Sequence, residues 1–594
     1  MNYYSDESEW KWLIKNAIDW DKIIPLYYKS FPTADGFNNK EELLGFFDEM
    51  LTATGEWSGE TLTPRAVELD KQGAGTVKDG VTIPGELLQK SYDEAKELAL
   101  IGLCAEPEFG GMGVPLIVGM LAFSQMNRAC IATATQLGFY TSIIDMIERF
   151  CTHEEKERLI PQIVSGELSG SMCLTEPGCG SDLGSLKTSA EKREDGKYTI
   201  NGSKIFITNG GGGLGFVLAR IKGAPTGLEG ISLFLVEQFI DGDRSNLNYK
   251  IAKNEEKMGL HGSFTCEVVY ENSVGTLVGE EHKGFQYMLH LMNEARVSVG
   301  LQSLGGMEAC LHYAKEYAKE RTQFGKSLLD LPLYKRNFDE WETERDAFRA
   351  LMVDTLSAFD IYQKLDMKQR HSNDLSEDEL KLFKEAKKKV RRRTPLVKYY
   401  GTETFTLLSQ RAIQALGGYG FITEYQAERW HRDSFAPLLY EGTSQIQALM
   451  ALKDLMKYIM KNPTKFFQSM VYSHPFGGLF NSQSEHQRKF QTIQYEFKKA
   501  LSALLVKTLR PDVDLNDLSE MLKLFDAKNW VTEDKFNLLM THAETICQSM
   551  AYMENYRVLV EHTSIDESRG DLADRYEKLI RPRLEAIYTD WKLS

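Results

Sequence analysis

One carboxylate in this sequence stands where a general base would be expected. Glu441 lies in the segment 438–447, LLYEGTSQIQ, between an apolar, aromatic run and a Gly-Thr-Ser turn. Burial beside the preceding leucines and tyrosine would raise the pKa of Glu441 above its reference of about 4.3, making it a stronger proton acceptor. Gly442 would let the backbone approach a ligand closely. Alone, the segment also fits an ordinary helix start, with the hydroxyl residues as a cap and the glutamate as an ion-pair partner.

Two glycine-containing turns earlier in the chain have the composition of a ligand cradle. Residues 173–182, CLTEPGCGSD, follow a β-rich run and offer amide and hydroxyl donors to a flat polar ring or a phosphate. Residues 204–211, KIFITNGG, place Phe206 two positions before Thr208, so strand alternation predicts a stacking face and a hydrogen-bonding group on one side. Each turn could be a plain hairpin. The glycines at 210–213 lack the strand-turn-helix context of a dinucleotide fingerprint, which excludes a Rossmann site.

A second group of candidate residues follows in the helical part of the chain. Arg321 opens the segment RTQFG, and the planar fork of its guanidinium suits a pyrophosphate, although a helix-ending salt bridge is the alternative. The glycines of 414–421, QALGGYGF, permit close backbone approach. The loop 106–113, EPEFGGMG, is either a plain connection or a ligand contact.

Composition restricts the class of protein. The chain has 594 residues, 42% hydrophobic and 26% charged, as in a soluble globular protein of several structural units, and no apolar run is long enough to span a bilayer. The first six residues resemble neither a secretory signal nor a transit peptide, so we expect a cytoplasmic protein. The net charge of −15 opposes binding to nucleic acid. Eight scattered cysteines without CxxC pairs suggest reduced thiols, and we expect no metal site.

Periodicity divides the chain into helical and β-rich regions. We predict strands at 197–208, 216–221, 231–238 and 266–270, and helices at 86–100, 285–319, 334–366 and 377–390. The Asn-Pro step at 462–463 ends a helical run. The expected organisation is an N-terminal helical domain with an N-terminal extension (1–165), a central β domain (166–279), a helical bundle domain (280–461) and an appended C-terminal helical domain (462–594).

The motifs occur together in a specific order. TEPGCGSD, KIFITNGG, RTQFG, QALGGYGF and YEGTSQIQ resemble, in that order and approximate spacing, the FAD-dependent acyl-CoA dehydrogenase family, over about residues 83–457. The appended segments and the sequence MGLHGS at 258–263 look like the long bacterial subgroup, which includes 3-methylmercaptopropionyl-CoA dehydrogenase and broad fatty acyl-CoA dehydrogenases.

The resemblance implies an α+β, mostly α fold with an N-terminal helical domain, a central β-barrel-like domain and a helical bundle, plus the appended helices. FAD would lie between the β domain and the bundle. Glu441 would remove the pro-R α-proton of an acyl-CoA while the β-hydrogen leaves as hydride to flavin N5, giving a trans-2-enoyl-CoA. The main-chain amide of the glutamate and a ribityl hydroxyl would polarise the thioester carbonyl. The implied acceptor is an electron-transfer flavoprotein. The implied assembly is at least a homodimer, because FAD sites would be shared between protomers.

The resemblance also assigns residues position by position. The residues expected to line the flavin are Met172, Leu174, Thr175, Gly180, Ser181, Phe206 and Thr208. Those expected to hold the adenine and pyrophosphate half are Arg321, Gln323, Phe324, Gln414, Gly418, Thr443 and Gln445. Substrate contacts are expected from Ser181, Asn293, Arg296, Tyr440 and Gly442.

The sequence departs from the family pattern at two positions. Some relatives carry their base immediately before the arginine that matches Arg296; this chain has Ala295 there, and Glu294 lies one residue off. We therefore assign the base to Glu441 alone. Phe264 stands where the subgroup more often has proline.

Two alternative functions stay open at this point. An acyl-CoA oxidase would share the first half-reaction and return the electrons to oxygen. A DNA-binding member of the fold is suggested by the basic run 387–393, KKKVRRR, although such a run is more often the solvated face of a helix.

Overall fold

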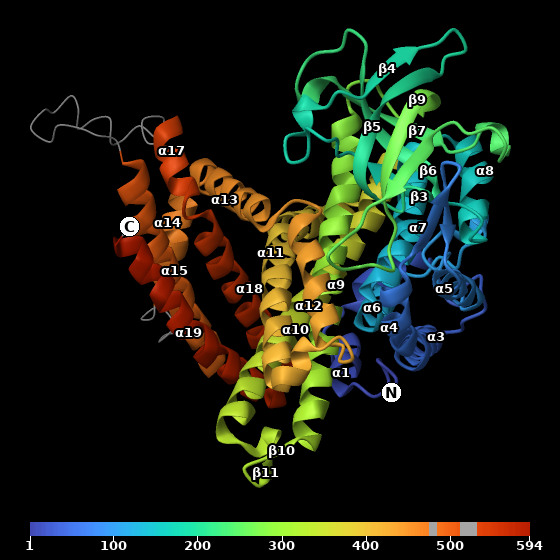
Figure 1. Cartoon of the computed structure of the whole chain (residues 1–594). Helices are drawn as coiled ribbons and strands as arrows, with labels where there is room; N and C mark the ends of the chain where they lie inside the picture. Colours follow the sequence, from blue (N-terminus) through green and yellow to red (C-terminus); the bar gives the residue numbers. More distant parts are fainter. Residues whose placement is uncertain (475–483, 511–531, 594) are drawn as a thin grey trace, which may run out of the picture.

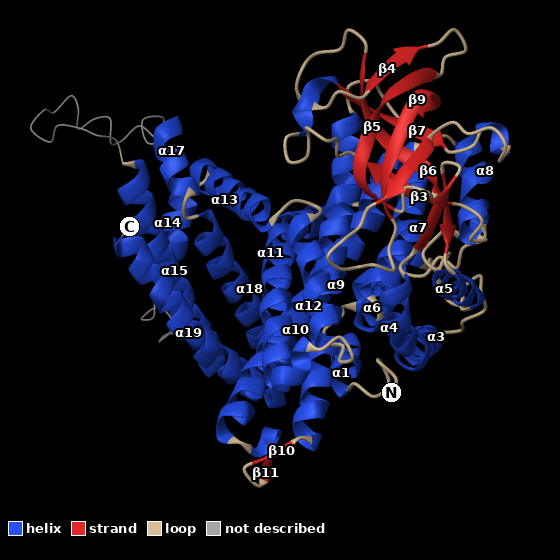
Figure 2. Ribbon diagram, viewed as in Figure 1, coloured by secondary structure: helices blue, strands red, loops and turns tan. Residues whose placement is uncertain are grey.

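The computed structural model describes residues 1–474, 484–510 and 532–593. It confirms the predicted fold class, with a helical N-terminal region, a central β domain, a bundle of long helices and appended C-terminal helices (Figure 1). The β domain and the appended helices lie on different sides of the bundle (Figure 2). The domain limits at 165, 279 and 461 stay predictions.

The N-terminal region contains eight helices among the described residues. They are α1 (Ser8–Asn16), α2 (Trp20–Tyr27), α3 (Lys40–Glu56), α4 (Thr63–Gln72), α5 (Glu86–Glu97), α6 (Leu116–Ala129), α7 (Ile131–Phe150) and α8 (His153–Val164). Helix α6 is buried on nearly every side and packs against the bundle. A hairpin of β1 (Gly75–Lys78) and β2 (Val81–Pro84) interrupts these helices, which the sequence analysis missed. Its Asp79-Gly80 turn has φ of 52° and 81°, the left-handed conformation that favours such a dipeptide in hairpins.

The β domain is built around a closed ring of strands. Its strands are β3 (Ser169–Cys173), β4 (Ser189–Lys192), β5 (Tyr198–Thr208), β6 (Gly213–Ile221), β7 (Ile231–Glu237), β8 (Lys250–Asn254) and β9 (Thr265–Leu277). Strands β6, β4, β5, β9 and β7 pair in a circle, since β7 pairs again with β6. Closure leaves those five strands without an open edge, and the turns that follow β3 and β5 carry the two predicted cradles.

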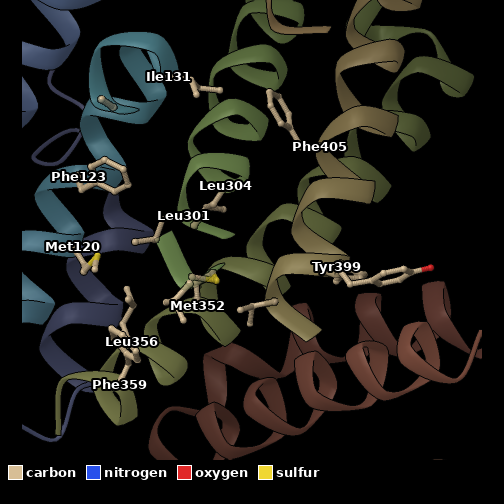
Figure 3. Close-up of a cluster of buried hydrophobic side chains, with 14 of the residues drawn as sticks. Met120, Phe123, Ile131, Leu301, Leu304, Met352, Leu356, Phe359, Tyr399 and Phe405 are labelled. Carbon is tan, nitrogen blue, oxygen red and sulfur yellow. The ribbon is translucent and has the colours of Figure 1, made fainter. Parts of the chain in front are cut away.

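The bundle consists of long helices that share one core. Its helices are α9 (Gly284–Glu320), α10 (Pro332–His371), α11 (Glu377–Leu416), α12 (Ala427–Leu439) and α13 (Ser444–Lys461), with short strands β10 (Thr322–Gln323) and β11 (Lys326–Ser327) after α9. Leu301 and Leu304 of α9 lie among side chains from α6, α10 and α11 (Figure 3). The predicted helix 377–390 continues to Leu416 through Pro395, because α11 packs against α9, α10, α12 and α13 and burial outweighs the local break.

The appended region is also helical where it is described. It comprises α14 (Pro463–Tyr472), α15 (Glu485–Leu509), α17 (Glu533–Met540), α18 (Ala543–Ile565) and α19 (Gly570–Leu593). Helix α18 packs against α10, α11 and α13. Among the described residues, no helix combines the length and the apolar character needed to cross a membrane.

Candidate functional site

Glu441 lies in the connection between α12 and α13 and borders a large internal cavity. The cavity encloses about 1040 Å³, including its opening to solvent, and is lined by Tyr440 and Glu441 together with side chains of α6, α7 and α9. Glu441 has a φ of 58°, a conformation that costs energy for any residue other than glycine. A strained residue facing a cavity indicates a functional position.

The cavity is apolar over most of its wall and reaches the β domain at one side. Leu103, Met120, Phe123 and Leu291 are among its apolar lining residues. Met172 and Thr208, both predicted to line the flavin, also border it. The structure therefore brings Glu441, Met172 of β3 and Thr208 of β5 to one cavity.

Three side chains hold the Glu441 turn through its main-chain carbonyls. Arg296 Nε donates to the Glu441 carbonyl at 3.2 Å. Gln447 Nε2 donates to the carbonyls of Glu441 and Gly442 at 3.0 and 3.1 Å. Lys398 Nζ donates to the Gly442 carbonyl at 2.7 Å. The sequence analysis found Arg296 but missed Lys398 and Gln447, since nothing in a helical pattern marks a residue that folds back onto a distant turn.

The environment gives Glu441 the proton affinity of a base. Burial raises the pKa of Glu441 to about 7, against the opposing charges of Arg296 and Lys398. Burial likewise lowers the pKa of Lys398 to about 8. The preceding leucines contribute less to the desolvation of Glu441 than expected. Leu439 is 64% exposed, and of residues 438–440 only Tyr440 lines the cavity. Tyr440 donates to Gln302 Oε1, and Gln302 Nε2 donates to Thr135 Oγ1 at 2.9 Å.

A buried ion pair braces the first cradle turn. Lys204 Nζ lies 2.8 Å from Glu176 Oε1 and donates to the Leu174 carbonyl at 2.9 Å. Glu176 also accepts from the main-chain amides of Lys187 and Thr188. These contacts hold the buried side of the turn, whereas Gly180 and Ser181 at its tip are exposed.

The second cradle departs from the expected strand alternation. Phe206 has a φ of 59°, and the pairing of β5 with β9 is irregular between Lys204 and Ile207. Thr208 lines the cavity, but Phe206 is 63% exposed and is not part of its wall. A bulge interrupts the alternation on which the prediction of a shared face depended.

Five residues of the second predicted group lie near the far end of α9. Arg321 follows that helix, with its guanidinium 5.8 Å from the ring centre of Tyr419, next to Gly418. Phe324 is 91% exposed. Gln323 is exposed, and Gln414 accepts a hydrogen bond from Arg411. Helix α9 has 37 residues and so spans about 55 Å, which separates this group from the β domain at the helix start.

Other predicted residues lie at or near the Glu441 turn. Thr443 Oγ1 accepts from the amide of Ile446 at 3.5 Å and caps α13. Gln445 Nε2 donates to Glu544 Oε1 of α18 at 3.0 Å. Asn293 Oδ1 accepts from Arg296 at 2.9 Å.

The residues of both groups leave room for a ligand. A β-carbon added at Gly418 would meet no atom within 4 Å, and at Gly180 only the Thr175 methyl at 3.9 Å. Exposed aromatic rings at Phe206 and Phe324, with a guanidinium at Arg321, offer stacking and phosphate contacts. These donors and open surfaces fit the ring and phosphate parts of a flavin dinucleotide.

Four of the six basic residues in the run on α11 form ion pairs with acidic side chains. Arg392 and Arg393 both pair with Glu554 of α18, at 2.7 and 3.3 Å. Lys389 pairs with Asp354 and Arg391 with Asp454. The run attaches the appended helices to the bundle, which argues against a DNA-binding surface there.

Comparisons with known proteins place these features in one family. The acyl-CoA dehydrogenase N-terminal, middle and C-terminal domains match residues 48–167, 171–273 and 282–456. An acyl-CoA dehydrogenase of Bacillus subtilis is 33% identical over 361 residues, which cover 60% of this chain and 87% of the relative. The 3-methylmercaptopropionyl-CoA dehydrogenase of Ruegeria pomeroyi is 30% identical over 66% of this chain and 68% of its own length.

A solved structure extends the similarity to the appended helices. The acyl-CoA dehydrogenase of Bacillus anthracis, solved in complex with FAD, superposes with a TM-score of 0.74 over 92% of this chain and 88% of its own, at 21% identity. At that identity the match shows the shared fold.

Proposed function

The chain belongs to the acyl-CoA dehydrogenase family, and from this membership and the cavity around Glu441 we propose that it dehydrogenates an acyl-CoA thioester between its α and β carbons. The product is a trans-2-enoyl-CoA. One observation carries the proposal: a buried carboxyl with a pKa of about 7 borders the same cavity as the β-domain residues Met172 and Thr208.

Glu441 acts as the base that removes the α-proton. A carboxyl group whose pKa is near 7 is about half ionised at neutral pH, and its ionised form is a stronger proton acceptor than an ordinary glutamate. Arg296 and Lys398 oppose the cost of burying its charge, and the bonds to the main-chain carbonyls of the turn hold it against its strained φ. The apolar wall excludes water, which strengthens any hydrogen bond to the thioester carbonyl.

The cofactor is FAD, supported by family membership and by the Bacillus anthracis structure with FAD. FAD supplies the acceptor for the β-hydrogen, which it takes as hydride. Met172, Leu174, Thr175, Gly180, Ser181, Phe206 and Thr208 would hold its ring. The other end would be held by Arg321, Gln323, Phe324, Gln414, Gly418, Thr443 and Gln445.

The residues expected to hold FAD are divided between two parts of the chain. The cavity that Met172 and Thr208 border meets α9 between Leu291 and Gln302, whereas Arg321 follows the end of that helix, roughly 30–45 Å further along it. We therefore propose that a second copy supplies the Arg321 end of the site, in a homodimer or a larger homo-oligomer, as the family resemblance implies. The exposed Phe324 and Arg321 are the surface that such a copy would cover.

Replacing the base tests the reaction. In Glu441→Gln we expect anaerobic reduction of bound flavin by saturated acyl-CoA thioesters to slow by about 10²–10⁴-fold, with FAD still bound. The control Glu424→Gln, at an exposed glutamate beyond the end of α11, is expected to react like wild type. Full activity of the Glu441 variant, or a protein that stays colourless after FAD addition, would overturn the proposal.

The electron acceptor separates the dehydrogenase from the oxidase. We propose an electron-transfer flavoprotein, on the family resemblance. Turnover with such a protein and no hydrogen peroxide under air supports this acceptor, whereas stoichiometric peroxide identifies an oxidase.

A further inference from the structure

A second cavity adjoins the one that contains Glu441. It has a volume of about 580 Å³, including its opening to solvent, and shares the lining residues Ile101, Leu116, Thr141 and Glu294 with the first cavity. Glu294 is 1% exposed and stands on α9, two residues before Arg296. The two spaces thus meet at a buried carboxyl that the proposed reaction does not use.

The walls of the two cavities differ in chemistry. The first is mostly apolar, whereas the second combines apolar side chains such as Ile144 and Met367 with charged groups. These are the carboxyl groups of Glu106, Asp145, Glu148 and Glu294 and the cations of Arg149 and Lys364. A hydrocarbon chain would gain little in the second cavity, because it would desolvate these polar groups without replacing their hydrogen bonds.

Both cations already have protein partners. Arg149 Nε lies 2.8 and 2.9 Å from the Asp145 oxygens, and its terminal nitrogens donate to Asp366 and to the Gln363 carbonyl. Lys364 Nζ lies 2.7 Å from Glu106. A ligand with a carboxylate would therefore meet four protein carboxyl groups and no free cation among these lining residues.

The two innermost carboxyl groups favour their neutral forms. Burial raises the pKa of Glu294 and of Glu148 to about 8 each, with the negative charge of Asp145 adding to the effect. Ser142 Oγ donates to Glu294 Oε1 at 2.8 Å, while Gln363 Nε2 reaches Oε2 only at 3.4 Å. A neutral carboxyl there can donate its proton and also accept a hydrogen bond, which matches a group that does both.

We propose that the second cavity is a subsite for a neutral hydroxyl-bearing part of the acyl group, and that Glu294 is the residue that selects for it. The inference rests on the proposed function, since it assumes that a CoA thioester occupies the first cavity. The hydroxyl would accept from a neutral glutamate and donate to a neighbouring carboxyl oxygen. A plain hydrocarbon would desolvate the polar lining groups without forming those hydrogen bonds, and the protein carboxyl groups would repel a terminal carboxylate.

Binding to a holoenzyme that cannot turn over tests the subsite directly. In the Glu441→Gln holoenzyme we would measure the Kd of matched pairs of acyl-CoA thioesters, one plain and one with a terminal hydroxyl, over increasing chain length. At the length that reaches Glu294 we expect the hydroxylated member to bind about ten-fold more tightly. Adding Glu294→Leu is expected to remove that preference, and Glu294→Gln, which preserves the shape, to retain part of it.

A matched control separates polarity from packing. Met126 lines the first cavity only, so Met126→Leu is expected to change the Kd of both members of a pair alike. Equal or tighter binding of the plain thioester at every length, or an unchanged ratio in Glu294→Leu, would overturn the subsite. Tighter binding of the hydroxylated thioesters, without flavin reduction in the wild type, would contradict the dehydrogenase reaction but support the subsite. Failure of every thioester to bind would overturn both.

Discussion

The two ends of α9 carry two halves of the predicted site, and they are built differently. At the β-domain end, buried side chains hold the reactive residues: Lys204 braces the first cradle, and Arg296, Lys398 and Gln447 hold the Glu441 turn. At the other end, Arg321, Gln323 and Phe324 are exposed. The residues around Glu441 are held by contacts within one chain, whereas those at the far end of α9 are exposed.

Because the two ends differ in this way, we expect substitutions at each end to affect different properties of the protein. Substitutions at the braced end should damage stability or chemistry in the isolated chain, because the contacts they remove are internal. Substitutions at the open end should leave the fold intact and act on cofactor affinity and assembly. Four experiments test this difference between the two ends.

The largest effect is expected from Lys204→Met. It leaves Glu176 buried without its cation, so the free energy of unfolding should fall by about 3–5 kcal/mol, with weakened FAD binding. Denaturant unfolding and a flavin titration measure both. Lys250→Met, which breaks an exposed ion pair of the same sheet, is the control and should cost less than about 1 kcal/mol. Similar losses in the two variants would show that the cradle is not braced by this pair.

The next effect is expected from Arg321→Ala. Losing a charged hydrogen-bond donor should weaken FAD binding by about 1.5–3 kcal/mol, while thermal unfolding of the apoprotein stays unchanged. Arg336→Ala removes an exposed arginine that pairs only within α10, and it should alter neither quantity. Equal FAD affinity in the two variants would contradict a role for the open end.

Gln447→Leu should give a smaller effect, on the reaction rate rather than on FAD affinity. It removes two donors from the Glu441 turn but leaves Arg296 and Lys398 in place, so kcat should fall by about ten-fold with FAD affinity retained. Stopped-flow flavin reduction measures the rate. Gln548→Leu, in the appended helix α18, is the matched control. A loss of FAD affinity without a change in rate would reverse the assignment.

The mildest test changes only pH. Because burial raises the pKa of Glu441 to about 7, kcat/KM for anaerobic flavin reduction should rise ten-fold per pH unit below 7 and level off above it. The same raised pKa means that this carboxyl stabilises the fold at low pH and loses that contribution as pH rises through 7. Glu441→Gln should remove this part of the pH dependence of stability. A rate that is flat from acidic to alkaline pH would exclude Glu441 as the titrating base.

Much of the architecture could be predicted from the sequence because the long elements have clear periodicity. The bounds of α9 and β5 agree with the predicted helix 285–319 and strand 197–208 within a residue or two. The hairpin of β1 and β2 was missed because each strand has only four residues. Helix α11 was cut short at residue 390 because local signals around Pro395 oppose a helix that tertiary packing stabilises.

The site residues divide in the same way. Motifs pointed to Glu441 and the two cradles, because glycines, hydroxyl groups and an isolated carboxylate form a recognisable order, and the family resemblance added Arg296. They gave no sign of Lys398 on α11, of Gln447 on α13, or of the second cavity, which residues from several separate helices line. Nor did they reveal that the basic run 387–393 would pair with acids of α10, α13 and α18.

The family, the fold class and the candidate base follow from the sequence, since these depend on short local patterns. How that base is buried, what holds its turn, and which polar groups meet beside the first cavity depend on the tertiary structure. The physical reason is that a pKa and a cavity wall are set by neighbours in space, which helices far apart along the chain supply.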